Sequence, residues 1–354
     1  MKKITIVIFI ITTCYTTCAF ARKHKKHSAY VPVWQSMNLD GVNIFNYFHA
    51  SNGDDYAVNN TNFIYYHASG TKAGLWKKID TNIIKEKYHF YNDISVQAIY
   101  VYKQMMLIAI QTAGLFASFD GGKTWSRTQA QFFFFSVYES NITGVIDQSS
   151  SKLVIFIQSK GCIKKAVIDP VHLDEILKAT WTNISPAGSS TGYSHIQFFN
   201  NKMYTNSLYG FSKGTTFISQ DYGNTWKHII IYSSGIPAVS GASVSQNYVT
   251  DENVMYAATN YGVYKSEDGI NWKFIGFRGK IIEGICMLNG VLYVGIHRQG
   301  IYSSPDNGQH WFHDNNDAIN KNKNPAFYIR YKYFYIHASK IILLTNVGLY
   351  QYSG

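Results

Sequence analysis

Charged residues are scarce in this chain of 354 residues, at 15%, whereas hydrophobic residues make up 46%. This balance excludes a disordered chain and a coiled coil, because both need many more charged or polar positions. With only six prolines, the chain is neither collagen-like nor a proline-rich linker protein. Aromatic residues are abundant instead (28 Tyr, 22 Phe and 7 Trp), and their preference for strands indicates a β-rich fold.

Cysteine is scarce too. Two of the four cysteines, Cys14 and Cys18, lie near the start, and a lipid anchor there is disfavoured because threonine precedes each of them. Cys162 and Cys286 remain, and two isolated cysteines make no disulfide framework, so we expect each to be buried in a strand. The 12 histidines show no metal-ligand spacing. We therefore expect neither a metal nor a cofactor.

The first residues have the pattern of an export signal. Lys2 and Lys3 precede an apolar run over residues 4–11, and residues 19–21 (AFA) supply a small-x-small cleavage pattern. The run is too short to cross a bilayer. The sequence therefore predicts a signal peptide over residues 1–21, cleaved after Ala21, no stable membrane insertion, and a secreted or periplasmic protein.

Positive charge is concentrated in a short basic arm over residues 22–30. The formal charge is +11, and removing Lys2 and Lys3 with the leader leaves +9, of which four charges lie in this arm. Such an arm is usually solvated, and less often a patch for anionic lipid or polysaccharide. The remaining body, at +5, is too mildly basic to indicate a nucleic-acid binder.

A repeated octapeptide decides the expected fold. Residues 118–125 read SFDGGKTW, 219–226 read SQDYGNTW and 304–311 read SPDNGQHW, while 266–272 give a shorter copy, SEDGINW. In each, Asp can bond nearby backbone N–H groups and Gly can adopt a turn conformation before the returning strand. Two short strands precede each copy and one strand follows it. This is the strand order of one propeller blade. Decayed copies end at Trp76 and Trp181, and residues 169–179 look like an inserted helical turn capped by Asp169.

Tryptophan spacing gives the number of blades. The seven tryptophans lie at 34, 76, 125, 181, 226, 272 and 311, with separations of 42, 49, 56, 45, 46 and 39 residues. Each separation is close to one blade length. The C-terminal segment 348–354 lacks a following strand, and residues 31–36 can supply it. We therefore predict one all-β domain over residues 31–354, a seven-bladed β-propeller closed by pairing its N-terminal strand with the C-terminal blade.

The S-x-D-x-G-x-T-W pattern resembles the Asp-box (BNR) repeat of sialidase-like β-propellers, and in size the chain is closest to the photosystem II assembly factor-like, non-catalytic members. The resemblance implies that the boxes fix turns at the rim opposite the substrate face. The structural residues would be Asp120, Asp221, Asp268, Asp306, Trp125, Trp226, Trp272 and Trp311.

The opposite face is the expected binding face, because loops between second and third strands meet loops between blades there. The predicted ligand-binding residues are Arg298, Arg278, Asn260, Asn346, His297 and Gln299, with Arg298 the strongest candidate. Their side chains suit hydroxyl- or carboxylate-bearing ligands. The same loops also contain Thr112, Asn206, Tyr261 and the polar stretch 314–323. A separate run of four aromatic residues occupies positions 132–135.

The expected function is a non-catalytic, monomeric platform that binds a protein or a cell-surface glycan. The alternative is a glycoside hydrolase of sialidase type, and the resemblance then implies three arginines that clamp a carboxylate. Only Arg278, Arg298 and Arg330 are placed to do so, and the Arg-Ile-Pro segment of those enzymes is absent. A paired-carboxylate mechanism would need two acids in one cleft, and Glu283 and Glu139 are the candidates. No catalytic residue is assigned.

Overall fold

The structure is a computed structural model that describes residues 34–353, except 45, 60, 73, 112, 131–140, 160–161, 188–192, 194–195, 207–214, 231–243, 250–253, 315–330 and 338–339. Several predicted features therefore lie outside the described residues. They are the signal peptide, the basic arm, Thr112, the aromatic run 132–135, Glu139, Arg330 and the stretch 314–323 beyond Asp314.

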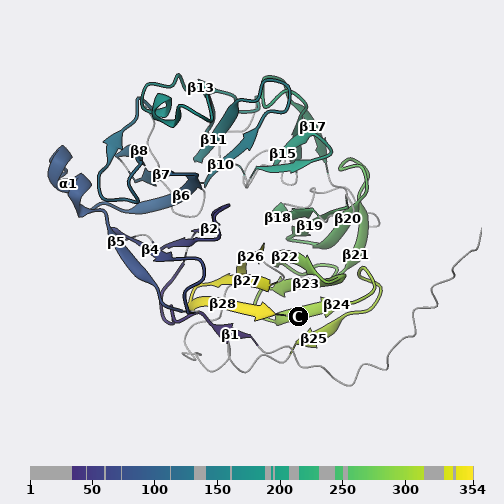
Figure 1. The fold of residues 1–354 in the computed structure, drawn as a ribbon. Coiled ribbons are helices and arrows are strands. Elements are labelled where there is room, and N and C mark those ends of the chain that lie inside the picture. Colours follow the sequence, from purple (N-terminus) through teal and green to yellow (C-terminus); the bar gives the residue numbers. More distant parts are fainter. Residues whose placement is uncertain are drawn as a thin grey trace, which may run out of the picture. The chain divides into compact units, whose positions relative to one another are not determined.

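The described chain forms seven four-stranded antiparallel sheets, the blades of a β-propeller, as predicted (Figure 1). The first three blades consist of β2 (Asn46–His49), β3 (Asp55–Val58), β4 (Phe63–His67) and β5 (Lys77–Asp80); β6 (Val96–Tyr102), β7 (Met105–Ile110), β8 (Gly114–Ser118) and β9 (Ser126–Arg127); and β10 (Asn141–Ile146), β11 (Leu153–Ser159), β12 (Cys162–Ile168) and β13 (Thr182–Asn183). The next two consist of β14 (Gln197–Phe199), β15 (Lys202–Asn206), β16 (Thr215–Ser219) and β17 (Lys227–Ile230); and β18 (Val244–Val249), β19 (Met255–Thr259), β20 (Gly262–Ser266) and β21 (Lys273–Gly276). The last two consist of β22 (Ile282–Leu288), β23 (Val291–Ile296), β24 (Gly300–Ser304) and β25 (Phe312–Asp314); and β26 (Tyr331–His337), β27 (Lys340–Thr345), β28 (Gly348–Ser353) and β1 (Gln35–Ser36).

The core lies between neighbouring blades. Strand β7 (MMLIAI) is buried on both faces, because its sheet packs against a blade on each side. One apolar cluster joins side chains of β6–β8 to those of β10–β12, and another joins β19–β20 to β22–β23. Continuous apolar strands without alternation are the sequence pattern expected for strands covered on both faces.

Each of the seven tryptophans immediately precedes the outermost strand of one blade, which confirms the blade count. Several indoles also join two blades. Trp226 Nε1 donates to the backbone oxygen of Ile184 at 2.6 Å, and Trp76 Nε1 donates to that of Met37 at 2.7 Å. At these two positions the indole N–H is therefore satisfied by the neighbouring blade, whereas Trp125 Nε1 donates to the Gly122 oxygen of its own turn.

The N-terminal strand closes the ring, as predicted. Strand β1 pairs antiparallel with β28, with Gln35 opposite Gln351 and Ser36 opposite Tyr350. Trp34 is 1% exposed, and its ring centroid lies 5.5 Å from that of Tyr352. The last blade is therefore built from both ends of the described chain.

The four repeated turns share one hydrogen-bond pattern. Asp221 Oδ1 accepts from Ser219 Oγ at 2.7 Å and from the Thr225 N–H at 2.8 Å, while Oδ2 accepts from Thr225 Oγ1 at 2.6 Å. Equivalent bonds hold the turns at Asp120, Asp268 and Asp306. At Gly308, with φ +89°, an added Cβ would lie 2.8 Å from Ile275 of the preceding blade, so glycine serves both the turn and close packing.

Two short helices lie between strands in the described part of the chain. The inserted turn is a 3-10 helix, η1 (Leu173–Leu177), but its predicted cap is wrong because His172 holds the N-cap position. Asp169 instead lies 2.8 Å from Lys152 Nζ and accepts a hydrogen bond from the Val171 N–H. Helix α1 (Asn82–Tyr88), between the first two blades, was not predicted.

Candidate functional site

The predicted binding residues lie at one end of the sheets. In an antiparallel blade the turn between second and third strands and the connection to the next blade leave from the same end. Asn260 is in the β19–β20 turn, His297, Arg298 and Gln299 form the β23–β24 turn, and Asn346 is in the β27–β28 turn. Arg278 lies in the β21–β22 connection. We call this end the loop face.

Backbone hydrogen bonds bring two of these turns together. The Gly279 N–H donates to the Tyr261 oxygen at 3.2 Å, and the His297 N–H donates to the Ile281 oxygen at 2.9 Å. The connection that carries Arg278 therefore bridges the turn of Asn260 and the turn of Arg298. Asn346 lies on the next blade, where the Gly41 N–H donates to the neighbouring Val347 oxygen.

Both arginines are exposed on this face. The guanidinium carbon of Arg278 lies 4.9 Å from the Phe274 ring centroid, a cation–π contact that fixes the direction of the side chain. Arg298 has a φ of 61° at the tip of its turn. Left-handed backbone is uncommon for a residue with a side chain, and it often marks a constrained turn.

An acid–histidine pair lies beside Arg298. His297 Nδ1 is 2.6 Å from Glu283 Oε1, and the two side chains are 25% and 14% exposed. Glu283 lies at a β-bulge, where the β22–β23 register shifts between Ile282 and Gly284. Bulges re-aim a side chain. From the sequence, His297 is predicted to bind a ligand, and Glu283 is a candidate acid of the glycosidase alternative. In the structure the two side chains are in contact.

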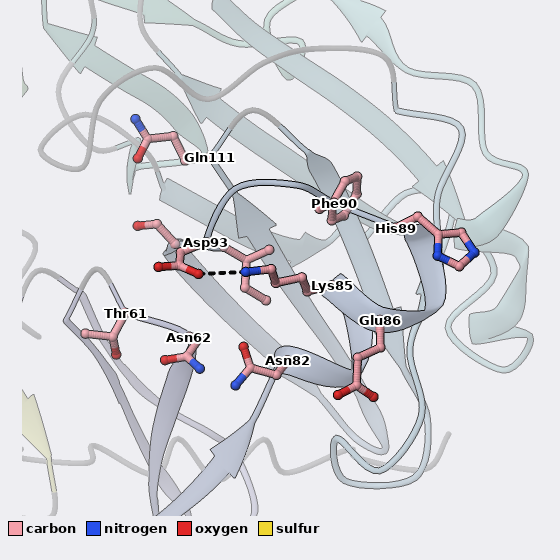
Figure 2. Close-up of a pocket in the computed structure, with 11 residues that line it drawn as sticks. Thr61, Asn62, Asn82, Lys85, Glu86, His89, Phe90, Asp93 and Gln111 are labelled. Atoms are coloured by element: carbon pink, nitrogen blue, oxygen red, sulfur yellow. Dashed lines mark hydrogen bonds and ion pairs between the residues drawn. The ribbon is translucent and has the colours of Figure 1, made fainter.

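A cavity of about 880 Å³ lies elsewhere on the loop face, between the first two blades. Thr61 and Asn62 of the β3–β4 turn, α1, and Gln111 of the second blade surround it (Figure 2). Ser95, just before β6, also lines it. Sequence reasoning missed this site. Ile84 and Tyr88, four positions apart, are a short sequence signal for α1.

The walls of this cavity are tied together by hydrogen bonds. The Thr81 N–H and Oγ1 both donate to the Asn62 backbone oxygen, at 3.0 and 2.6 Å. The Val96 N–H donates to the Thr61 oxygen at 3.1 Å, and the Gln111 N–H donates to the Ser95 oxygen at 2.9 Å. These bonds join the two blades and α1 around the opening, so the cavity is preformed.

Three other features that could carry a function are a metal-ligand cluster, a cysteine and a membrane-spanning helix. Within the described ranges, no group of three or more His, Cys, Asp or Glu side chains could hold a metal ion. Cys162 and Cys286 are free thiols in strands, the latter buried and the former half-buried. The described part of the chain contains no helix long and apolar enough to span a membrane.

No known protein-family model matches this chain. Among curated proteins, an oligoxyloglucan-reducing end-specific xyloglucanase of Emericella nidulans is 22% identical in an alignment of 224 residues that covers 56% of this chain and 27% of the xyloglucanase. The chain thus spans about a quarter of the length of that relative.

Solved structures share the fold. A structure of YCF48 bound to a D1 peptide matches with a TM-score of 0.62 at 12% identity, covering 92% of this chain and 97% of the YCF48 chain. The GH74 xyloglucanase from Xanthomonas campestris matches with a TM-score of 0.62 at 14% identity, covering 90% of this chain and 53% of the enzyme. At such identities the likeness shows a common β-propeller fold.

Proposed function

We propose that this protein is an exported, non-catalytic propeller that binds another protein through its loop face. The whole-length likeness to YCF48 bound to a D1 peptide carries this proposal, because that structure is one propeller of the same extent. The xyloglucanase structure is about twice as long as the part this chain matches. We further propose that the four repeated turns are Asp-boxes with a structural role, that the leader ends at Ala21, and that residues 31–354 act as a monomeric unit.

The binding surface in this proposal is the pair of joined turns around Arg298. Two exposed arginines, Arg278 and Arg298, lie on these joined segments together with the His297–Glu283 pair and Asn260. Arginine can bond a carboxylate through two parallel hydrogen bonds, and it is enriched among residues that dominate protein interfaces. A partner segment with an acidic side chain or a chain terminus fits this surface best.

Replacement of Arg298 by Ala tests the proposal. Full-length protein captures partners from the envelope fraction of its own source, and each purified partner is then titrated by calorimetry. We expect Arg298→Ala to weaken binding about tenfold or more while the melting temperature stays nearly constant, because the side chain is exposed. Lys123→Ala removes the same charge from an exposed residue of a turn at the opposite end of the blades and should bind like wild type.

Two outcomes would contradict this function. Equal loss of binding and of thermal stability in Arg298→Ala would assign Arg298 to structure. Turnover would favour the alternative of a glycoside hydrolase, which the xyloglucanase similarity supports. The purified protein should therefore be inactive on a fluorogenic sialoside and on xyloglucan oligosaccharides, measured by fluorescence and by release of reducing ends.

A further inference from the structure

The cavity beside α1 presents hydrogen-bonding groups that the protein itself does not use. Asn62 and Asn82 are half-buried lining residues, and their side-chain amides make no hydrogen bond to any described residue. Each amide carries one acceptor oxygen and two donor hydrogens. In Figure 2 both lie on the same side of the Lys85–Asp93 pair as Thr61, with Gln111 on the other side. A ligand here meets neighbouring donors and acceptors.

The charges around the cavity disfavour an anion. Lys85 Nζ lies 2.7 Å from Asp93 Oδ1, so this lysine is already paired, and its hydrogen bond and charge lower the pKa of Asp93. Glu86 adds a second carboxylate to the lining. The lining therefore holds the cation of Lys85 against two carboxylates, with His89 as its other titratable group, and this balance disfavours a phosphate or carboxylate ligand.

The apolar part of the lining is small. It consists of Phe90 and Ile94, and the Phe90 ring packs at 88° against Phe116 with centroids 6.2 Å apart. A peptide docked in a pocket normally needs larger apolar anchors. One aromatic ring among amides and hydroxyls instead matches a pyranose, which has an apolar C–H face and hydroxyls that both donate and accept.

We propose that the cavity lined by Thr61, Asn62, Asn82, Lys85, Phe90 and Gln111 binds an uncharged saccharide of one to three units. This site is separate from the protein-binding surface around Arg298, and the proposal does not depend on that surface. The cavity of about 880 Å³ is within the range of small-molecule sites. The saccharide hydroxyls bond the free amides of Asn62 and Asn82, and α1 provides the wall that distinguishes this blade junction.

Saturation-transfer NMR on the full chain tests the site. The probes are glucose, galactose, xylose, N-acetylglucosamine and their β-linked disaccharides, with galacturonic acid as the charged comparison and calorimetry for each sugar that binds. We expect at least one neutral probe to bind, and Asn62→Ala and Asn82→Ala each to weaken it about tenfold. Galacturonic acid should bind more weakly than galactose.

The controls separate this site from the proposed function. Gln309→Ala removes an exposed amide from a turn at the opposite end and should leave sugar binding unchanged, as should Arg298→Ala. Unchanged melting temperatures in Asn62→Ala and Asn82→Ala show that the fold is intact. Failure of every neutral probe, equal binding of the uronic acid, or loss of a protein partner instead of a sugar in these variants would overturn the proposal.

Discussion

At the scale of single residues, Asp314 at the end of β25 is a carboxyl group taken out of water. Its side chain is buried, Ser303 Oγ donates to Oδ1 at 3.1 Å, and Oδ2 has no partner among the described residues. Burial raises the pKa of Asp314 to about 6, against the opposing effects of the Ser303 hydrogen bond and of His313. Because the folded pKa is higher than the unfolded one, ionisation of Asp314 destabilises the fold as the pH rises from about 4 through 6.

The variant Asp314→Asn tests whether ionisation of Asp314 destabilises the fold. Asparagine keeps the Oδ1 acceptor and cannot ionise, so we expect it to melt at a higher temperature than wild type at pH 7. The difference should shrink as the pH falls from 7 toward 4, because the wild-type carboxyl is then protonated in the folded state and increasingly so in the unfolded chain. Calorimetric melting curves from pH 4 to 8 measure it. A difference that is constant with pH would mean that Asp314 does not titrate in this range.

The sequence predicted where the candidate binding residues lie in the fold, but it did not predict which of their side chains contact one another. His297, Arg298 and Asn260 were assigned to turns from strand spacing alone, and the structure has them there. Glu283, which contacts His297, lies at a bulge in β22, and no local sequence pattern predicts this bulge. Asn62 and Asn82 are ordinary loop residues in the sequence, and only the folded arrangement of two blades and α1 places them in one cavity.

At the scale of elements, the repeated turn is a unit whose aspartate organises the chain around it. Burial raises the pKa of Asp221, but hydrogen bonds from Thr225 and Ser219 outweigh it and lower the value to about 2. The stabilisation by the ionised carboxylate is therefore present above the unfolded pKa, near 4, and is lost as the pH falls toward 2. The turn thus contributes to the fold at neutral pH.

Replacing Asp221 by Ala should cost about 1–2 kcal/mol of unfolding free energy, because two backbone or hydroxyl donors of Thr225 and one of Ser219 lose their acceptor. Urea denaturation at pH 7 measures this cost. Asp174→Ala, which removes an exposed acid from η1, should be nearly neutral. Partner binding should survive in Asp221→Ala; its loss in a folded variant would place this turn in the binding surface.

Helix α1 shows why some elements escape sequence reasoning. Seven residues are too few for a reliable periodicity, and an isolated helix of this length is unstable in water. Its stability comes from the neighbouring blade, where Ile84 is fully buried, Tyr88 Oη accepts the Arg127 N–H at 3.0 Å, and Lys87 Nζ donates to the Trp125 oxygen. These contacts join residues that are about 40 positions apart, so local propensity could not reveal them.

At the scale of the whole molecule, regular spacing made the architecture predictable and left the ligand undetermined. Every blade must cover its neighbour, so each one repeats a tryptophan before its outer strand, and seven indoles mark seven sheets. Function imposes no such repetition. The loop face differs from blade to blade, with α1 at one junction and the turns of Arg298 and Asn260 at others.

Ring closure has the largest expected effect on folding. Strand β1 pairs with the edge of β28, and the Met37 N–H donates to the Leu349 oxygen at 2.9 Å. The Trp34 ring packs against Phe334 and Tyr352. Without residues 34–36 the last blade exposes a strand edge and loses a buried indole. We expect a chain that begins at residue 37 to lose its cooperative melting transition, whereas a chain that begins at residue 31 should keep it.

A rearranged chain separates closure from a general need for an intact N-terminus. Because β1 runs antiparallel to β28, residues 31–36 can be joined after residue 354 through a short turn and can pair in the same register, Gln35 with Gln351. This permuted protein should regain a cooperative transition, measured by calorimetry and by near-ultraviolet circular dichroism. Adding Trp34→Ala to it should remove about 3–5 kcal/mol, the usual effect of deleting a buried aromatic side chain. A normal melting curve for the chain that begins at residue 37 would show that the seven sheets hold together without this strand.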